Sequence, residues 1–194
     1  MFTNLSQGPS SKAARGMTLI EVIVALPIVL VALGMFLQML TAGIGVRATS
    51  GETWAVSCAA QDVLERMRNT PFRELFRQYN ADPMDDVGGA ATGPGNVFAV
   101  GNMEPIDSDD DGFVGEVILP FANVGTQLAP IWHVREDHAN EELGTPRDLN
   151  ADSLVDAFDH SNNYSILPVL VRVRWQGRWG PRTFTLSTVL SEER

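Results

Sequence analysis

An uncharged apolar run near the amino terminus constrains this chain more than any other feature. No Asp, Glu, Lys or Arg stands between Glu21 and Arg47, and most of those positions are Val, Ile, Leu, Ala, Met or Phe. As a helix that rises about 1.5 Å per residue, residues 22–46 would extend roughly 37 Å, which exceeds the hydrocarbon core of about 30 Å in a bilayer. The sequence therefore predicts a membrane-spanning helix with an acidic residue at its front edge.

Three interpretations of this run compete. A cleaved secretory signal has an apolar core of about 7–15 residues and a small-residue cleavage site, whereas this run is longer and no clean Ala-x-Ala site follows it. A plain signal anchor fits the length but gives no reason for Glu21, because an acid at the centre of a membrane segment costs about 2.5–3.5 kcal/mol. The third interpretation starts from the leader, which contains Lys12 and Arg15, has no acid and ends in Gly16.

The stretch Lys-Ala-Ala-Arg-Gly followed by Met-Thr-Leu-Ile-Glu-Val resembles the amino-terminal signal of type IV pilins and type II secretion pseudopilins. The resemblance implies that a prepilin peptidase cuts between Gly16 and Met17 on the cytoplasmic face, and that the new terminal amine is methylated. Glu21 then becomes the fifth residue of the mature chain, where the family keeps a glutamate. Met17 departs from the family, which usually has Phe there.

The same resemblance implies a location and a set of partners. The chain would be a single-pass inner-membrane protein whose carboxy-terminal domain lies in the periplasm, or on the cell surface after filament assembly. Its partners would be the prepilin peptidase, other pilin or pseudopilin subunits and the inner-membrane assembly platform. Glu21 would neutralise the amine of Met17 on a neighbouring subunit or on its own. Whether the filament is a type IV pilus, a type II secretion pseudopilus or a DNA-uptake filament stays open.

The predicted domain organisation follows from these boundaries. Residues 1–16 form the leader, 17–46 the transmembrane and assembly helix, 47–79 an amphipathic helical continuation, and 80–194 a globular α+β domain. Pro27 is expected to kink or locally melt the membrane helix, because it removes a backbone hydrogen bond. We expect the helix to loosen at residues 49–51, to continue with an apolar face at helical spacing, and to break near Pro71.

Strand patterns occupy the rest of the domain. They predict strands at 116–121, 128–134, 165–175 and 183–190, with a short one at 96–100 and a hairpin turn at 176–181. An amphipathic helix followed by these strands predicts an α+β fold, with the long N-terminal membrane-spanning helix packed on a C-terminal antiparallel β-sheet in a pilin-like roll. The terminal hairpin also resembles that of smaller pseudopilins and minor pilins.

Charge, cysteine and histidine usage narrow the function further. The net charge of −10 argues against general nucleic-acid binding, which needs clustered Lys and Arg. Cys58 is the only cysteine, so no internal disulfide can form, and its neighbours predict a small core residue. His133, His138 and His160 lack the spacing of a zinc site or a nucleophile–base pair. We expect His160 to be a surface residue, and the alternative is a pH-sensitive neighbour of the acidic stretch 148–159. We therefore expect no enzymatic activity.

The stretch 148–159 has the oxygen spacing of an EF-hand-type calcium loop. Such a loop gives a hard cation about six to eight oxygens from positions 1, 3, 5, 7, 9 and 12. Here the candidate metal ligands are side-chain oxygens plus one backbone carbonyl, in the order Asp148, Asn150, Asp152, Leu154, Asp156 and Asp159. The loop most resembles the dockerin version, which ends in Asp, but Ser153 stands where glycine is wanted for the sharp turn.

A second acidic stretch opens in the same way with Asp107, Asp109 and Asp111, and it has glycine at position 112. Positions 9 and 12 of this loop are Gly115 and Ile118, so it cannot close a coordination shell unless another acid such as Glu116 helps. The expected cofactor is a structural calcium ion. The alternative for both stretches is a solvated acidic surface loop. At the level of the whole chain, the alternative is a signal-anchored, calcium-binding or adhesive envelope domain that does not polymerise.

Overall fold

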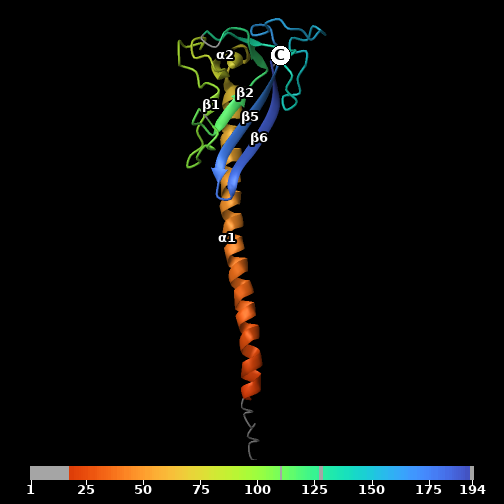
Figure 1. Cartoon of the computed structure of the whole chain (residues 1–194). Coiled ribbons are helices and arrows are strands. Elements are labelled where there is room, and N and C mark those ends of the chain that lie inside the picture. Colours follow the sequence, from red (N-terminus) through yellow and green to blue (C-terminus); the bar gives the residue numbers. More distant parts are fainter. Residues whose placement is uncertain (1–17, 110, 127–128, 193–194) are drawn as a thin grey trace, which may run out of the picture. The chain divides into compact units, whose positions relative to one another are not determined.

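The computed structural model describes residues 18–109, 111–126 and 129–192, without the side chains at positions 44–46 and 48. The chain forms two compact units that divide between Arg47 and Ala48, and the helix α1 (Leu19–Asn69) contributes residues to both. The architecture is α+β, as predicted, because an apolar helix near the amino terminus is followed by an antiparallel sheet (Figure 1).

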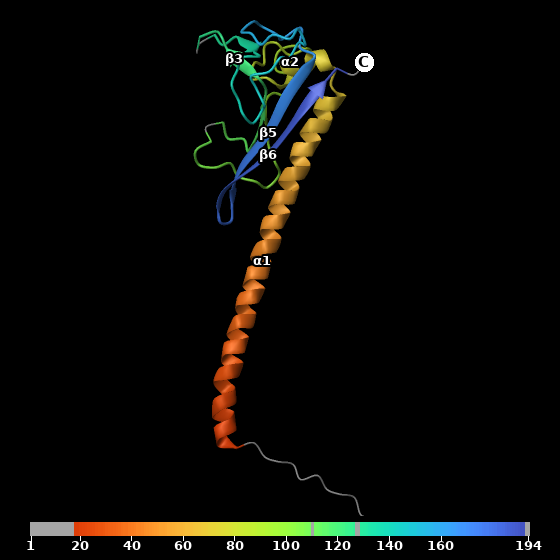
Figure 2. The same ribbon diagram turned by 90° about the vertical axis from the view of Figure 1, so that its right-hand side faces the viewer.

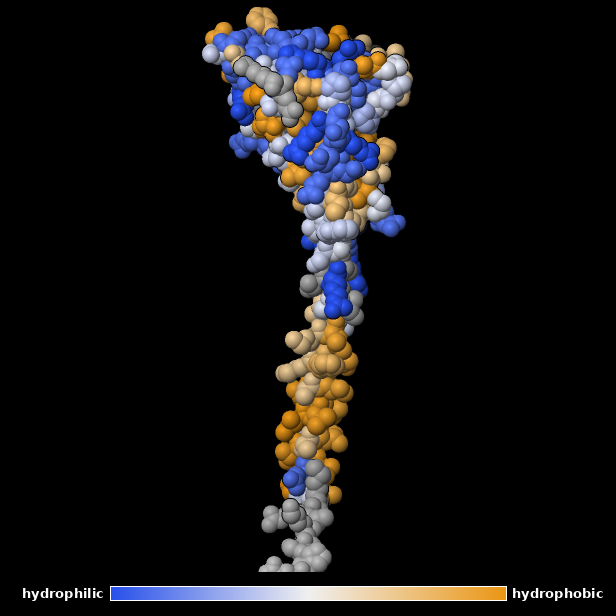
Figure 3. Space-filling view, turned by 180° about the vertical axis from the view of Figure 1, so that it is seen from behind, coloured by the Kyte–Doolittle hydropathy of each residue, from blue (hydrophilic) through white to orange (hydrophobic). Residues whose placement is uncertain are grey.

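In the first unit, α1 starts where the carbonyl of Thr18 accepts hydrogen bonds from the backbone N–H groups of Glu21 and Val22, at 3.1 and 3.3 Å. Pro27 does not interrupt the helix. Leu19–Gly43 is the one helical segment among the described residues that is long and apolar enough to cross a membrane, judged by length and composition, and its most apolar window is not buried at all. Apolar side chains cover the face of this segment that is seen in Figure 3.

The predicted loosening at residues 49–51 is wrong, because α1 continues through them without a break. The Thr53 hydroxyl group donates to the carbonyl of Thr49 at 2.9 Å, and the Ser57 hydroxyl group donates to the carbonyl of Thr53 at 2.8 Å. Such bonds to the preceding turn let Ser and Thr stay within a helix. The hydroxyl groups that follow the predicted interruption are therefore satisfied within the helix.

The second unit uses the amphipathic part of α1. The predicted apolar face is confirmed, since its buried members recur at helical spacing: Val56, Ala60, Val63, Leu64 and Met67. Cys58 contradicts our prediction, because its side chain is exposed. It lies two residues from both Val56 and Ala60, and at about 100° per residue two positions lead to the opposite side of the helix.

The helix α1 ends at Asn69, just before Pro71, as predicted. Side chains satisfy its last carbonyls: the Asn69 amide donates to the carbonyl of Glu65 and the Thr70 hydroxyl group to that of Arg66. The 3-10 turn η1 (Phe72–Glu74) and the short helix α2 (Leu75–Tyr79) follow. The side chains of α2 that face the core are Leu75, Phe76 and Tyr79.

The main sheet contains β1 (Val97–Phe98), β2 (Gly115–Ile118), β5 (Ile166–Gly177) and β6 (Gly180–Ser191), in that order and antiparallel throughout. β5 and β6 pair along their whole length and join through Arg178 and Trp179, which confirms the predicted hairpin. Pro168 lies beyond Leu170, where the pairing of β5 with β2 stops, so its missing N–H is not needed by a ladder on that side.

A second, two-stranded sheet pairs β3 (Phe121–Asn123) with β4 (Trp132–Val134). The single strand predicted over 116–121 is therefore wrong: it ends at Ile118, and Phe121 starts a strand of the other sheet. Pro120 stands between the two and cannot donate to a ladder. The strand predicted over 128–134 is shorter than expected, and the one over 96–100 is limited to Val97–Phe98. Figure 2 shows β3 apart from β5 and β6.

The core of the second unit lies between α1 and the main sheet. Ala60, Leu64 and Met67 of the helix belong to the same buried cluster as Val169 and Val171 of β5. The residues of β6 alternate between half-buried and exposed almost to its end, which is the period-two pattern of a strand with one covered face.

Candidate functional site

The predicted processing and assembly residues stand at the amino-terminal edge of the apolar helix. Gly16 and Met17 lie outside the described residues. Glu21 lies in the first turn of α1 with an exposed side chain, and its Oε2 is 3.5 Å from the backbone nitrogen of Thr18. The partial positive charge at a helix amino terminus favours a carboxylate in this position. No other described acid lies within Leu19–Gly43.

The first half of the loop 148–159 folds around its own acidic side chains. The two carboxylate oxygens of Asp148 accept hydrogen bonds from the backbone N–H groups of Ala151 and Ser153, at 2.6 and 2.8 Å. Asn150 Oδ1 and Asp152 Oδ1 each accept from the N–H group two residues further on, at 2.9 and 2.8 Å. Each oxygen has more than one lone pair, so these bonds leave acceptor capacity for a cation.

Ser153 adopts the backbone conformation that a glycine would be expected to supply. Its φ is +70°, and Ala151 in the same loop has a φ of +67°. Positive φ values are uncommon for residues with a side chain. The loop therefore makes its sharp turn despite the serine. Ser153 differs from the glycine of the calcium-loop pattern in residue type, but its backbone has the left-handed conformation that the glycine would supply.

The second half of the loop turns its carboxylates to other partners. Asp156 Oδ1 is 3.0 Å from His160 Nε2. Asp159 Oδ1 accepts from the backbone N–H and the hydroxyl group of Ser161, at 3.0 and 2.5 Å, and Asp159 Oδ2 lies 3.8 Å from His133 Nε2. The structure does not bring Asp156 and Asp159 together with the first-half ligands into one group of converging carboxylates.

Within the described ranges, one group of three His, Cys, Asp or Glu residues brings its ligand atoms within 4.8 Å of one another: Glu136, Asp156 and His160. Sequence reasoning missed Glu136, whose side chain is completely buried. Its Oε1 accepts from the backbone N–H groups of Leu149 and Asn150 at 2.7 and 3.1 Å, and its Oε2 from that of Asp156 at 3.3 Å. Glu136 therefore fixes both ends of the acidic loop.

His160 lies beside the buried Glu136 and the partly exposed Asp156, and the prediction of a surface histidine is wrong, since only 3% of its surface is exposed. Nε2 faces Asp156 Oδ1, and Nδ1 lies 3.1 Å from Asn163 Oδ1. These two oxygens can accept from an imidazolium, and a potential donor, the Asn150 amide nitrogen, also lies 3.4 Å from Nδ1.

Burial by itself lowers the pKa of His160, but the hydrogen bond to Asp156 and the charge of Glu136 outweigh it and raise the pKa above its ordinary value. The pKa of Asp156 is lowered by the N–H group of Phe158 and by His160. These directions agree: the cation and the carboxylate each favour the charged form of the other. A histidine–carboxylate pair accounts for this cluster without a metal ion.

The second acidic loop is held by arginine. Asp109 Oδ2 lies 3.3 Å from Arg174 of β5, and Asp111 Oδ1 accepts from the backbone N–H group of Phe113 at 2.8 Å. Asp107 is exposed. Burial raises the pKa of Glu116, and the nearby arginines oppose that shift. The predicted ligands Asp107, Asp109 and Asp111 do not form a group of converging carboxylates with Glu116.

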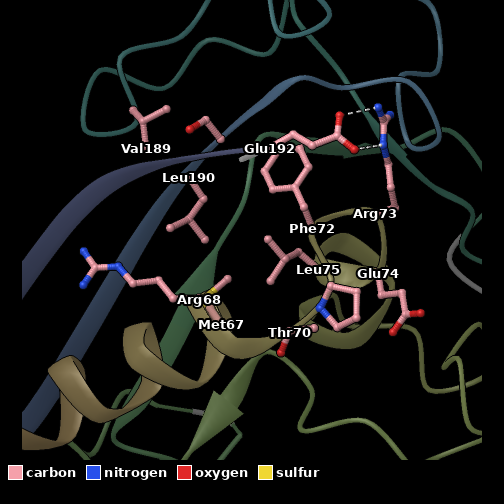
Figure 4. Close-up of a pocket in the computed structure, with 12 residues that line it drawn as sticks. Met67, Arg68, Thr70, Phe72, Arg73, Glu74, Leu75, Val189, Leu190 and Glu192 are labelled. Atoms are coloured by element: carbon pink, nitrogen blue, oxygen red, sulfur yellow. Dashed lines mark hydrogen bonds and ion pairs between the residues drawn. The ribbon is translucent and has the colours of Figure 1, made fainter. Parts of the chain in front are cut away.

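A pocket of about 640 Å³ opens where α1 ends beside the last residues of β6. Met67, Leu75 and Leu190 give it an apolar side. Arg73 and Glu192 close one edge through two hydrogen bonds of 3.1 and 2.7 Å (Figure 4). Because each charge of this pair satisfies the other, the edge offers no unpaired group to a ligand.

In comparisons with known proteins, no family model, no curated protein and no solved structure matches this chain.

Proposed function

We propose that the chain is a pilin-like structural subunit, cleaved by a prepilin peptidase and assembled into a type IV pilus or a type II secretion pseudopilus. The observation that carries the proposal is the position of Glu21. It follows Gly16 by five residues and opens a helical segment, Leu19–Gly43, that contains no other charged residue. The α+β arrangement downstream supports it, because a subunit of this kind displays a folded domain beyond its assembly helix.

The proposed role of Glu21 follows from the cost of an isolated charge in an apolar environment. When the helix leaves the bilayer and packs among other helices, an unpaired carboxylate is strongly destabilising. The amine of Met17 created by cleavage is the partner that compensates it, and only when neighbouring helices are in the correct register. Glu21 thereby ties subunit assembly to correct processing.

Intact-mass analysis of the membrane-extracted protein tests this proposal. We expect a mature chain that starts at a methylated Met17, and we expect Gly16→Asp to retain the longer precursor. A chain that keeps Met1 in the presence of an active prepilin peptidase would instead support the signal-anchored envelope domain that does not polymerise. Normal processing of the Gly16→Asp variant would refute the cleavage site.

The proposal includes a structural calcium ion in the loop 148–159. Its support is the oxygen spacing of the loop, the free acceptor capacity of Asp148 and Asp152, and the left-handed backbone of Ser153. Asp148, Asn150, Asp152 and the carbonyl of Leu154 would hold the ion. Asp156 and Asp159 would have to leave their histidine partners to complete the shell. The ion would order the loop and take no part in a reaction.

A further inference from the structure

The strand β6 forms one edge of the main sheet, because the strand order is β1, β2, β5, β6 (Figure 1). The opposite edge strand, β1, consists of Val97 and Phe98 alone. Short edge strands, charged side chains, prolines and bulges are the usual devices that keep an edge from pairing with another chain. The pairing of β6 with β5 has no bulge, and residues 183–191 contain neither a charge nor a proline. One edge of the sheet is therefore short, and the other is long and unprotected.

The register of the sheet shows which backbone groups of β6 point to the free edge. The N–H group of Arg174 in β5 donates to the carbonyl of Val114 at 2.7 Å, so Arg174 points toward β2 and away from β6. Successive residues of a strand alternate in this direction, so Val173 bonds to its partner on β6, Phe184. The residues of β6 that alternate with Phe184 point to the free edge, and their side chains are exposed: Thr183, Thr185, Ser187, Val189 and Ser191. Within the described part of the chain, no backbone carbonyl outside the β5 ladder accepts from them.

Hollows lie beside this edge, along the strip where α1 residues 61–68 face β6 residues 186–190, which we call the α1–β6 seam. One hollow of about 350 Å³ is lined by Leu64 of α1 and Leu186 of β6. It shares Arg68 with the pocket of about 640 Å³ at the end of β6 (Figure 4). Phe184 and Leu186 pack against the core, yet both remain half-buried. The seam therefore has unfilled space for the side chains of an added strand.

The charges along the seam and at its two ends already have partners. Three pairs have nitrogen–oxygen distances of 3.8, 2.9 and 2.7 Å, namely Arg182 with Glu52, Arg68 with Glu65, and Arg73 with Glu192. The chain carries a net charge of −10, but these pairs contain equal numbers of acids and bases. A charged ligand would lose hydration here without gaining an unpaired countercharge. The seam therefore complements an uncharged segment.

We propose that β6 and the α1–β6 seam bind an extended, uncharged segment of a partner protein, which adds a strand to the main sheet. The backbone of the segment would pair with the free-edge N–H and C=O groups of β6, because an extended polypeptide offers both groups at the repeat of a strand. Its alternate apolar side chains would enter the hollows beside Leu64 and Leu186 and cover the half-buried core residues.

A second copy of β6 fits this edge less well. Arg182 lines a hollow together with Thr53, whereas Leu190 lines one together with Met67, so β6 runs in the same direction as this part of α1. All pairings in the main sheet are antiparallel. An antiparallel pair of β6 strands would set two α1 helices in opposite directions, which conflicts with inserting both copies into one membrane. This step alone rests on the function proposed above, since a soluble peptide can test the edge by itself.

The test measures fluorescence anisotropy with the full chain in detergent micelles, and empty micelles correct for partition of the probe. The probe is a capped, fluorophore-labelled peptide of alternating Thr and Val, as long as Thr183–Ser191. We expect saturable binding, and replacing every Val by Glu should abolish it because the carboxylates would lose hydration. Two further peptides are N-methylated on one or the other alternate set of residues. N-methylation removes the N–H donor, and one set of donors faces β6, so one of these peptides should bind and the other should not.

Variants of the chain test the same edge from the other side. Ser187→Pro removes one free-edge N–H group without touching the ladder to β5, and proline is tolerated at such a position. It should weaken binding of the Thr–Val peptide about tenfold, which is the effect of losing one good hydrogen bond. The matched control Ser187→Ala keeps the N–H group and should bind as the wild type does. Melting temperatures check that both variants fold.

Absence of saturable binding by the Thr–Val peptide overturns the proposal. Equal binding by the two N-methylated peptides does so as well, and this comparison stands even where Ser187→Pro does not fold. Sedimentation of the chain in detergent covers the remaining occupant. A dimer that Ser187→Ala retains, that Ser187→Pro abolishes and that the peptide does not dissociate would assign the edge to a second copy, against the proposal.

Discussion

The Tyr164 hydroxyl group donates a hydrogen bond of 2.6 Å to the backbone carbonyl of Phe72, joining the residues that precede β5 to the turn that follows α1. The two rings also meet edge to face, with centroids 5.0 Å apart. Tyr164 is completely buried, so this bond has no competition from water. It fixes where the chain turns after the long helix.

Removing that hydroxyl group should destabilise the domain. We expect Tyr164→Phe to lower the free energy of unfolding by about 1–2 kcal/mol, because the ring contact survives while the carbonyl of Phe72 keeps only one of its two donors, the N–H group of Leu75. Chemical denaturation of the full chain in detergent measures the change. Tyr79→Phe is the comparison at a second buried tyrosine, where the bond that is lost is to the Thr70 side chain and not to a backbone carbonyl. An unchanged unfolding midpoint for Tyr164→Phe would show that the N–H group of Leu75 alone satisfies the carbonyl.

Gly115 of β2 should not tolerate a side chain. A Cβ atom there would overlap the ring of Phe98, the residue that pairs with Gly115 across the β1–β2 ladder. We expect Gly115→Ala to destabilise the domain by about 1–3 kcal/mol, which is typical of overpacking a core. Gly101→Ala is the matched control, because a Cβ atom at that position meets nothing within 4 Å. Equal thermal stability of the two variants would contradict the packing described for β1 and β2.

The pair of His160 and Asp156 should make stability depend on pH. A raised pKa means that the folded state binds the proton more tightly than the unfolded state does. The resulting stabilisation is fully present below about pH 6.5, the ordinary pKa of histidine, and is lost as pH rises through the higher pKa of the folded state. We expect the melting temperature to fall over this interval, measured with a chelator present.

His160→Gln should lose this pH-dependent part while His138→Gln keeps it. The lowered pKa of Asp156 makes stability depend on pH in the acidic range. Its stabilisation is present above the ordinary pKa of a carboxylate and is lost as pH falls through the lower pKa of the folded state. An identical pH profile for the wild type and His160→Gln above pH 6 would show that the imidazole is not charged in the folded protein.

Glu21 should be needed for assembly and not for insertion. We expect Glu21→Ala and Glu21→Gln to reach the membrane in normal amounts but to be missing from sheared filaments or pseudopili, because neither can pair with the amine of Met17. Glu21→Asp, which keeps the charge on a shorter side chain, should retain partial incorporation. Immunoblots of membrane and filament fractions measure both. Wild-type incorporation of the alanine or glutamine variant would sink the pairing hypothesis.

Calcium should stabilise the acidic loop if the proposed ion binds there. At a free calcium concentration of 100 times the dissociation constant, the free energy of unfolding should rise by about 2.7 kcal/mol relative to protein in chelator. Asp148→Asn and Asp152→Asn should reduce this gain, whereas Asp62→Asn on α1 should not. Identical melting curves with calcium and with chelator would favour the solvated acidic loop.

Local patterns predicted the regular elements well. The apolar spacing from Val56 to Met67, the break at Pro71 and the alternation in β6 are set by residues near one another in the chain. The hairpin of β5 and β6 belongs to the same class, because its turn and both strands are contiguous. Local patterns were not sufficient at residues 116–121. This run has strand character throughout and was predicted as one strand, but Pro120 divides it between two sheets.

The buried charges could not be found from the sequence. Glu136 stands in a polar stretch that looks like any surface loop. Its burial depends on backbone N–H groups of residues 149, 150 and 156, which reach it only in the folded chain. The same holds for His160, which is buried and lies within hydrogen-bond distance of Asp156 and Asn163 only in the folded chain.

Because Cys58 is exposed, the chain has one accessible thiol that a reagent can modify. Cys58 is the only cysteine among 194 residues, so a disulfide bond between copies of this chain can form only between the Cys58 residues of two molecules. A maleimide dye or spin label placed on it marks one known position on the outer face of α1, with no background from a second thiol. Oxidative crosslinking of the native chain would therefore report directly whether the α1 helices of two copies come within bonding distance at that position.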